Sequence, residues 1–361
     1  MEGAGRFEAI SVSYAAGVIA AWALGGAPAA GIVCSVALLP LVLIAARHPS
    51  WRYTPDVLLP AAFLCLGVMG YAGAVATRGA WPAFGMGWLS EAADGALGAL
   101  QDRISATGVS GQTNALLRAL LTGDRSLLPR ETTAVFRQSG AAHILALSGL
   151  HLGIIYLVVR TVLAAAGNSP AARWVRAALA VALCGAYTFI TGWRPSTVRA
   201  LIYIIAAELH SLLPGRRRSP LGTLCLAAML QLIADPLLIR DTGFQLSYLA
   251  MTGTALVFPR LRSWYPAGLR FDPLRRLWEM LSLSISCQLF TAPLVWVRFK
   301  IFPRYFLVTN LVALPLTEVL MICALMMLAL GSVGLCPAFL PALCDRLADL
   351  LLLCLKAISS L

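Results

Sequence analysis

The sequence predicts an all-α membrane protein with many spans, and three observations carry this prediction. Hydrophobic residues make up 59% of the 361 residues and charged residues only 12%, whereas soluble domains are about half apolar and about a quarter charged. The mean hydropathy is +0.80. Long apolar runs recur along the chain, each sufficient for a helix across a hydrocarbon core of about 30 Å. Continuous runs, as opposed to short alternating segments, favour helices.

About eleven spans are expected, within a range of nine to twelve, since span boundaries read from sequence are uncertain by a few residues. Two of them, 177–192 and 197–213, are short for a complete crossing, so some spans are expected to be broken or re-entrant. The spans are predicted at 10–26, 28–46, 56–77, 142–166, 177–192, 197–213, 219–238, 243–259, 278–297, 305–332 and 337–358.

The stretch 78–141 has a different pattern, because apolar and charged residues alternate there at helical spacing. Leu97 and Ile104 share one predicted face, while Glu91 and Asp94 lie on others. This pattern is typical of amphipathic helices that lie on a membrane surface. We therefore expect amphipathic helices on the outer surface.

The net charge of +12 fits a polyanionic partner, but membrane proteins also gather basic residues in their cytoplasmic loops. Arginine clusters occur in the loops 47–52 and 216–218 and again over 260–276. These loops fall on one side if the N-terminus lies in the cytoplasm, so this orientation is predicted. Most of the cysteines lie inside apolar runs, so we expect them to be buried as small apolar side chains.

Polar residues interrupt the apolar run "HILALSGLHLG", residues 143–153. In a straight helix His143 and His151 would lie about 12 Å apart along the axis, too far to share a metal, and Gly149 offers a place for a break. Ser148 and His151, three residues apart, share a helix face. Three interpretations stay open: hydrogen bonds between packed helices, the lining of a polar pathway, and a serine nucleophile with a histidine base.

Four ordered motifs identify a family. They are "LLTGDRSLLPRETTAVFRQSGAAHILALSGLHLG" (120–153), "TGWRPSTVRALI" (191–202), "DTGFQLSYLAMTG" (241–253) and "NLVALPL" (310–316). The stretch 115–335 resembles the competence domain of the ComEC family, with an N-terminal transmembrane region at 1–77, a connecting amphipathic segment at 78–114 and a C-terminal transmembrane helix at 336–361. The resemblance implies a multi-pass protein of the bacterial inner membrane that passes single-stranded DNA into the cytoplasm during natural transformation.

The positions that match the family signature are not all expected to contact DNA. Those expected to be mainly structural are Gly123, Asp124, Arg125, Ser126, Gly149, Thr191, Gly192, Ser196, Phe244 and Ser247. The remaining matches, together with Tyr203, are the candidates for the DNA pathway: Arg199, Tyr203, His143, Ser148, His151 and Gln245.

Arg199 begins the predicted span at 197–213, and Tyr203 follows one turn later on the same face. A cation followed by an aromatic ring suits sequence-independent binding of a single strand, with phosphate contacts and base stacking. The alternative is that Arg199 reaches outward to lipid headgroups. Asp124 and Arg125 are expected to form an ion pair or a helix cap, and Glu208 to pair within the helix bundle.

The chain also departs from longer members of the family. It lacks an OB-like insertion, and its histidines His48, His143, His151 and His210 do not form the H-x-H-x-D-H cluster of metallo-β-lactamase-like nucleases. No Walker motif is present either. We therefore expect no catalysis, no metal and no cofactor in this chain.

The family implies a cytoplasmic ATP-driven motor, an external DNA receptor and a separate nuclease as partners, in addition to the lipid bilayer. The sequence is also compatible with a homo-oligomer. Two other functions also stay open, a transporter or channel for a small solute or ion on the same scaffold and an intramembrane serine hydrolase that uses Ser148 and His151.

Overall fold

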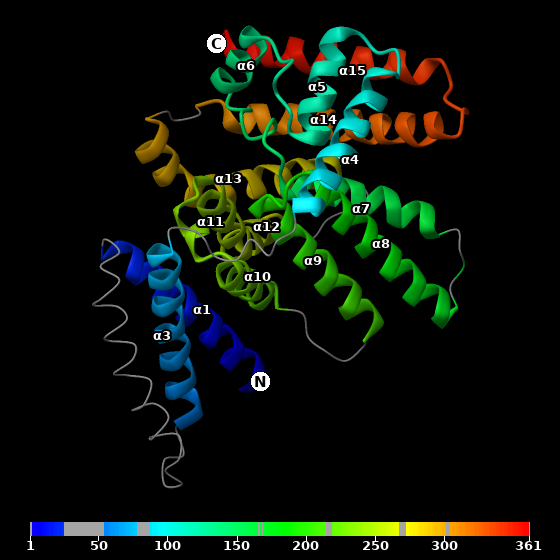
Figure 1. The fold of residues 1–361 in the computed structure, drawn as a ribbon. Coiled ribbons are helices and arrows are strands. Elements are labelled where there is room, and N and C mark those ends of the chain that lie inside the picture. Colours follow the sequence, from blue (N-terminus) through cyan, green and yellow to red (C-terminus); the bar gives the residue numbers. More distant parts are fainter. Residues whose placement is uncertain are drawn as a thin grey trace. The chain divides into compact units, whose positions relative to one another are not determined.

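The structure, a computed structural model, consists of helices and connecting turns, and the part of the chain that it describes contains no strand (Figure 1). The described residues are 2–24, 54–77, 87–164, 167, 169–213, 219–266, 272–300 and 304–360. The predicted all-α fold is confirmed. The predicted span 28–46 lies outside the described residues.

Four of the described helices are long and apolar enough to cross a membrane, judged by length and composition. They are α3 (Thr54–Ala76), α8 (Pro170–Ile190), α13 (Pro273–Phe299) and α14 (Phe306–Ser332). Shorter apolar helical stretches are Glu8–Ala23 within α1 (Glu2–Ala23), α7 (Gly149–Leu163) and α10 (Pro220–Ala234). The protein is a helical membrane protein.

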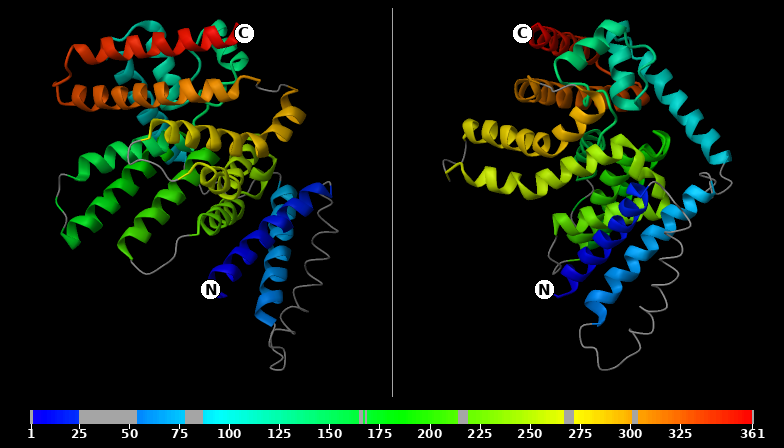
Figure 2. Two further views of the ribbon diagram at one scale, coloured as in Figure 1. Left: turned by 180° about the vertical axis from the view of Figure 1, so that it is seen from behind. Right: turned by 90° about the vertical axis from the view of Figure 1, so that its left-hand side faces the viewer.

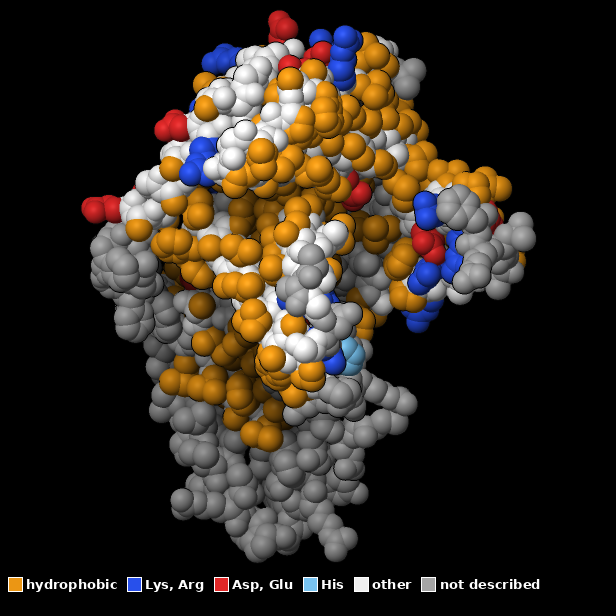
Figure 3. Space-filling view, turned by 90° about the vertical axis from the view of Figure 1, so that its right-hand side faces the viewer, with side chains coloured by type: hydrophobic (Ala, Val, Ile, Leu, Met, Phe, Trp, Pro, Cys, Tyr) orange, Lys and Arg blue, Asp and Glu red, His pale blue; other side chains and the backbone are white. Residues whose placement is uncertain are grey.

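Apolar side chains cover much of the described face shown in Figure 3, and charged side chains gather toward its edges. On α7 and α8, Val162 and Trp174 are 68% and 52% exposed. Exposed side chains of this size are costly in water but favourable against lipid. The surface therefore agrees with a membrane environment.

The helices divide into two compact units. The first unit comprises residues 1–86 and 209–255, and the second comprises residues 87–208 and 256–361. The predicted domain boundaries at 78, 115 and 336 rest on sequence motifs and stay predictions.

In the first unit, α1 and α3 approach each other through two glycines. A Cβ atom on Gly17 would overlap the carbonyl oxygen of Leu64, and one on Gly67 would overlap the carbonyl oxygen of Tyr14. Each glycine thus faces the backbone of the other helix, an arrangement that small residues permit between helices in membranes. α10, the short 3₁₀ helix η2 (Pro236–Arg240) and α11 (Thr242–Leu256) complete this unit.

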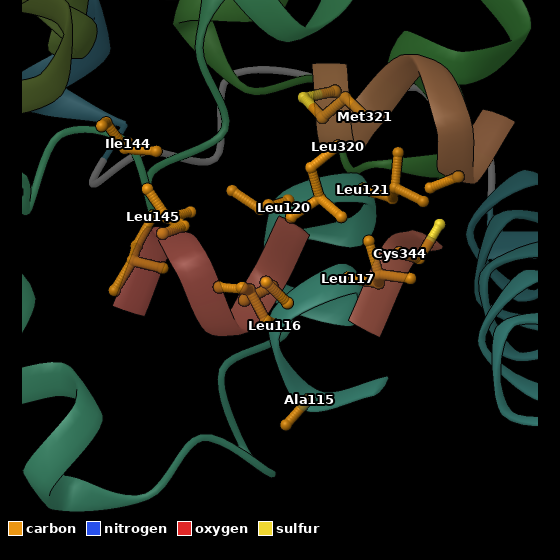
Figure 4. Close-up of a cluster of buried hydrophobic side chains, with 14 of the residues drawn as sticks. Ala115, Leu116, Leu117, Leu120, Leu121, Ile144, Leu145, Leu320, Met321 and Cys344 are labelled. Carbon is orange, nitrogen blue, oxygen red and sulfur yellow. The ribbon is translucent and has the colours of Figure 1, made fainter. Parts of the chain in front are cut away.

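The second unit contains the remaining helices, and its main core surrounds α5 (Gly111–Thr122). Leu116, Leu117 and Leu120 of α5 are fully buried and face side chains of α14 and α15 (Phe339–Ser359) (Figure 4). α14 and α15 run side by side in opposite directions (Figures 1 and 2). α5 is therefore a core helix, unlike the surface helix that its neighbours in sequence predicted.

The amphipathic pattern before α5 is seen in α4 (Gly87–Ser105). Ile104 is fully buried, whereas Glu91, Asp94 and Asp102 are exposed. α6 (Arg130–Gln138) follows α5 and buries Phe136 completely. The chain turns away after the end of α6 at Gly140, which has a φ of 82° that glycine adopts without strain.

α7 begins later than the sequence predicted. The expected span started at 142, but residues 141–148 form turns and the helix starts at Gly149. The carbonyl oxygens of Leu145 and Leu147 accept hydrogen bonds from the side chains of Arg125 and Ser196 instead of from a helix backbone. Side chains from distant parts of the second unit thus bond this segment in place of helical backbone hydrogen bonds.

Candidate functional site

The candidate site is the turn segment 141–149 and the helix start that follows it. Arg125 lies after α5, and its Nε and Nη2 atoms donate to the Leu145 carbonyl oxygen at 3.1 and 2.8 Å. Ser196 lies in the first turn of α9 (Pro195–Leu212), and its Oγ donates to the Leu147 carbonyl oxygen at 2.8 Å. Two family-signature side chains therefore fix the shape of the segment.

Two glycines allow other elements to approach this segment closely. Gly123 ends α5 with a φ of 75°, and a Cβ there would lie 2.7 Å from Leu147 Cδ1. A Cβ on Gly149 would lie 3.3 Å from Ala200 Cβ and 3.5 Å from Arg199 Nη2. Gly149 was expected to provide a backbone break, but its role here is to leave room for α9.

Ser148 and His151 form the N-terminal cap of α7. The Ser148 backbone N–H and hydroxyl both lie within hydrogen-bond distance of His151 Nδ1, at 3.1 and 2.7 Å. The N–H is a donor, so Nδ1 is the acceptor and a neutral ring carries its proton on Nε2. His151 is 1% exposed, and its Nε2 has no hydrogen-bond partner among the described residues.

His143 lies at the outer edge of the same segment. Its Nδ1 is 3.1 Å from the Gly140 carbonyl oxygen, and its side chain is exposed. Because residues 141–148 form turns, the separation of about 12 Å expected for His143 and His151 in a straight helix does not apply. No group of three His, Cys, Asp or Glu residues that could hold a metal ion occurs among the described residues.

Arg199 and Tyr203 lie one turn apart on α9. Arg199 is only 6% exposed, and its guanidinium borders Gly149 at the start of α7. Tyr203 is half-buried. Further along, Leu201 and Ile204 pack with Leu152 in a small apolar cluster. Arg199 is therefore held inside the second unit, close to the segment 141–149.

The GDRS motif, residues 123–126, makes two separate sets of contacts. Asp124 pairs with Arg118 at 3.0 Å and not with Arg125 as predicted, because Arg125 is turned toward the Leu145 carbonyl. The Asp124 carboxylate also accepts the backbone N–H of Ser126 at 2.9 Å. The hydrogen bonds from Ser126, assisted by Arg118, hold the pKa of Asp124 below its usual value.

The turn that leads into α9 is built by other signature residues. Thr191 Oγ1 donates to the Tyr187 carbonyl oxygen at 2.8 Å, and Gly192 takes a φ of 81°. Trp193 also has a positive φ, of 50°, which is uncommon for a residue with a side chain. This turn places Ser196 beside Leu147, whose carbonyl oxygen it bonds, and Arg194 beside Gly123.

Phe244, Gln245 and Ser247 belong to the first unit. Phe244 is 4% exposed and packs in that unit's apolar core. Gln245 Nε2 donates to the Ile239 carbonyl oxygen at 2.7 Å, across the corner between η2 and α11. The Gln245 amide thus holds this corner, which is a structural contact for a residue predicted to line the pathway.

A polar cluster that the sequence only partly indicated joins α7 to α9. The Glu208 carboxylate accepts hydrogen bonds from Tyr156 and Arg160, each at 2.5 Å. The Glu208 side chain is 6% exposed and that of Arg160 is 50% exposed. The predicted pairing of Glu208 inside the bundle is confirmed; its partners are spaced four apart on α7.

Replacing Glu208 by Gln is expected to lower the free energy of unfolding in detergent by about 1.5–3 kcal/mol, the range for hydrogen bonds to charged groups. The substitution leaves two donors facing a weaker, neutral acceptor. Glu131→Gln on the exposed face of α6 is the matched control and should change stability by no more than about 0.5 kcal/mol. Equal effects of the two substitutions would contradict a stabilising role for Glu208.

Comparison with known proteins connects this site to a family. The family model described as "Competence protein" matches residues 120–361, which include the segment 141–149, α9 and α14. The chain is 25% identical to ComE operon protein 3 of Bacillus subtilis over 203 residues, 55% of this chain and 24% of that protein. It is 26% identical to Recombination protein 2 of Haemophilus influenzae over 220 residues, 57% and 27%.

A further relative is the uncharacterized protein YcaI of Escherichia coli, which is 28% identical over 211 residues, 56% of this chain and 27% of that protein. The aligned regions thus cover about a quarter of the length of these curated relatives. No solved structure matches the chain. Because the family model covers well over half of the sequence, the chain belongs to the competence protein family, the ComEC family that the ordered motifs predicted.

Proposed function

We propose that this protein takes part in natural transformation by conducting single-stranded DNA through the bacterial inner membrane. The family supports a role in competence. The pathway that we propose follows the segment 141–149 and the first turns of α9, where Arg199, Tyr203, His143, Ser148 and His151 lie. The chain itself is proposed to be non-catalytic.

The observation that carries the proposal is the position of Arg199. A charged side chain deep in a membrane protein costs at least about 2.5–3.5 kcal/mol on insertion scales, and such residues usually face a bundle interior or water. Arg199 is 6% exposed and borders the start of α7, away from the apolar surface of the second unit. A guanidinium in this place suits contact with the phosphates of a passing strand.

The neighbouring groups extend this chemistry. The Tyr203 ring, one turn along α9, offers a surface on which a base can stack. His151 Nε2 is a buried nitrogen that has no hydrogen-bond partner in the part of the chain that the structure describes, and a buried donor without a partner is costly. A phosphate oxygen or a water in the pathway would satisfy it. Gln245 is the further candidate in the first unit, although its amide already bonds the backbone.

The proposed setting follows from the charges and the family. We propose that the N-terminus lies in the cytoplasm, where arginine-rich loops are usually found. The chain contains no motif for ATP hydrolysis and no nuclease cluster. By resemblance to the family, a cytoplasmic ATP-driven motor, an external DNA receptor and a separate nuclease are the proposed partners.

The test is complementation of a transformation-deficient strain that lacks its own homologue. The strain receives this chain alone, or this chain with a separate nuclease, and donor DNA carries a label on one strand or on the other. The proposal predicts that labelled single strands reach the cytoplasm when the chain and the nuclease are both present. Failure of internalisation in both strains, at normal membrane levels of the chain, would contradict the proposal.

A serine hydrolase is the second candidate, because Ser148 Oγ lies 2.7 Å from His151 Nδ1. The same nitrogen also receives the Ser148 N–H, and no carboxylate among the described residues orients the ring from Nε2, so the geometry fits a helix cap better. We expect a fluorophosphonate probe to leave Ser148 unlabelled, while Ser148→Ala lowers stability by about 1 kcal/mol. Labelling that disappears in Ser148→Ala would favour the hydrolase.

A further inference from the structure

Two arginines outside the proposed pathway residues lie together beside the segment 141–149. Arg125 reaches the Leu145 carbonyl oxygen at 2.8 Å. Arg194 Nε lies 3.8 Å from the position that a Cβ would take on Gly123, two residues before Arg125. Both side chains are exposed. The turn after α5 and the turn before α9 thus bring two guanidinium groups to one surface.

The charges of these two arginines are not neutralised by neighbouring carboxylates. Among the described residues, neither Arg125 nor Arg194 forms an ion pair. Asp124 is close in sequence, but Arg118 and the Ser126 N–H already bond its carboxylate. Desolvation, together with the positive charge of Arg194, lowers the pKa of Arg125 below its usual value. Like charges held together in this way favour an anion as a ligand.

The arrangement of the guanidinium groups indicates what kind of anion fits. Arg125 contacts Leu145, Arg194 lies beside Gly123, against which Leu147 packs, and Arg199 borders Gly149. Positive charge therefore follows the segment from residue 145 to residue 149. A repeated series of phosphates matches such a row better than a single phosphate does, and each guanidinium can bind a phosphate with two parallel hydrogen bonds.

We propose that Arg125 and Arg194 form a phosphodiester-binding pair that holds the nucleic-acid backbone next to Arg199. This inference rests on the proposed function and adds two residues that the pathway candidates do not include. Arg194 is the more direct test of the pair, because its side chain makes no hydrogen bond among the described residues. Arg125 also supports the Leu145 carbonyl, so its substitution affects the shape of the segment as well.

The experiment measures binding of a short fluorescent single-stranded oligonucleotide to the full chain in nanodiscs of uncharged lipid. Each phosphate contact contributes about 0.7 to the slope of log K against log salt concentration for a single strand. Arg194→Gln should reduce that slope by about 0.7, and Arg125→Gln with Arg194→Gln by about 1.4. Arg137→Gln, at an exposed arginine on α6, is the matched control and should leave the slope unchanged. Arg125→Lys, which keeps the charge, should keep the slope of the unmodified chain.

The outcomes separate this inference from the proposed function. If the unmodified chain binds the oligonucleotide and Arg194→Gln keeps the full slope, the phosphodiester pair is wrong while the proposed function stands. If the unmodified chain shows no salt-dependent binding, the proposed function fails as well. If Arg194→Gln weakens binding to phosphatidylglycerol vesicles and leaves the oligonucleotide slope intact, the ligand is a lipid headgroup, which also overturns the inference.

Discussion

Arg199→Ala is expected to lower internalisation of labelled DNA by about tenfold to a hundredfold at unchanged membrane levels of the protein. A hydrogen bond to a charged group contributes about 1.5–3 kcal/mol, and each 1.4 kcal/mol corresponds to about a factor of ten. Arg199 is 6% exposed and is the most buried of the three arginines beside the segment 141–149. The measurement is the amount of labelled strand inside cells, divided by the amount of protein in the membrane fraction.

Two variants control this result. Arg137→Ala removes an exposed arginine on α6 and should leave internalisation unchanged. Arg199→Lys keeps the charge without the planar fork and should retain part of the activity. A transporter for a small solute or ion would show the opposite result, with DNA internalisation unaffected by Arg199→Ala, and this outcome would favour that alternative.

Gly67→Leu is expected to destabilise the first unit by about 3 kcal/mol or more, because larger side chains in tightly packed places force the backbone apart. A Cβ at Gly67 would overlap the Tyr14 carbonyl oxygen, and backbone atoms of α1 have little freedom to move aside. The measurement is the free energy of unfolding in detergent, followed by circular dichroism. Gly17→Leu, on the opposite side of the same contact, should behave alike.

The matched control for this prediction is Gly95→Leu in α4. Apart from Gly95, its chain neighbours and the backbone of its own helix, no described atom lies within 4 Å of the position that a Cβ would take on Gly95. Leucine is a better helix former than glycine by about 0.8 kcal/mol or somewhat less, so this substitution should be neutral or slightly stabilising. Similar losses of stability in Gly67→Leu and Gly95→Leu would show that α1 and α3 do not pack through their glycines.

The fold could be predicted largely from hydropathy. The apolar runs at 56–77 and 305–332 correspond to α3 and α14 almost residue for residue. Such runs are reliable because the apolar solvent leaves a helix few alternatives. The burial of α5 was missed, because its polar positions resemble those of a surface helix, whereas its apolar side chains are buried by packing against α4, α14 and α15.

The site could be predicted only in part. The three-residue spacing predicted that Ser148 and His151 share one helix face; they lie close together, but Ser148 is the N-cap of α7 and not a residue within it. The late start of α7 could not be predicted, since it depends on Arg125 and Ser196, which lie far from the segment in sequence. The same holds for the pairing of Asp124 with Arg118 in place of Arg125. Local patterns give a residue's neighbours along a helix but not its partners from another element.

The central claim is that the Arg199 face of α9 lines the path of the DNA, and cross-linking at Tyr203 tests it most directly. The photoreactive amino acid p-benzoylphenylalanine replaces Tyr203, or the exposed Trp174 of α8 as a control, and cells are illuminated while they take up labelled DNA. The account predicts a covalent link between labelled single strands and the protein at position 203 and none at position 174. Cross-links at position 174 without any at position 203 would contradict it.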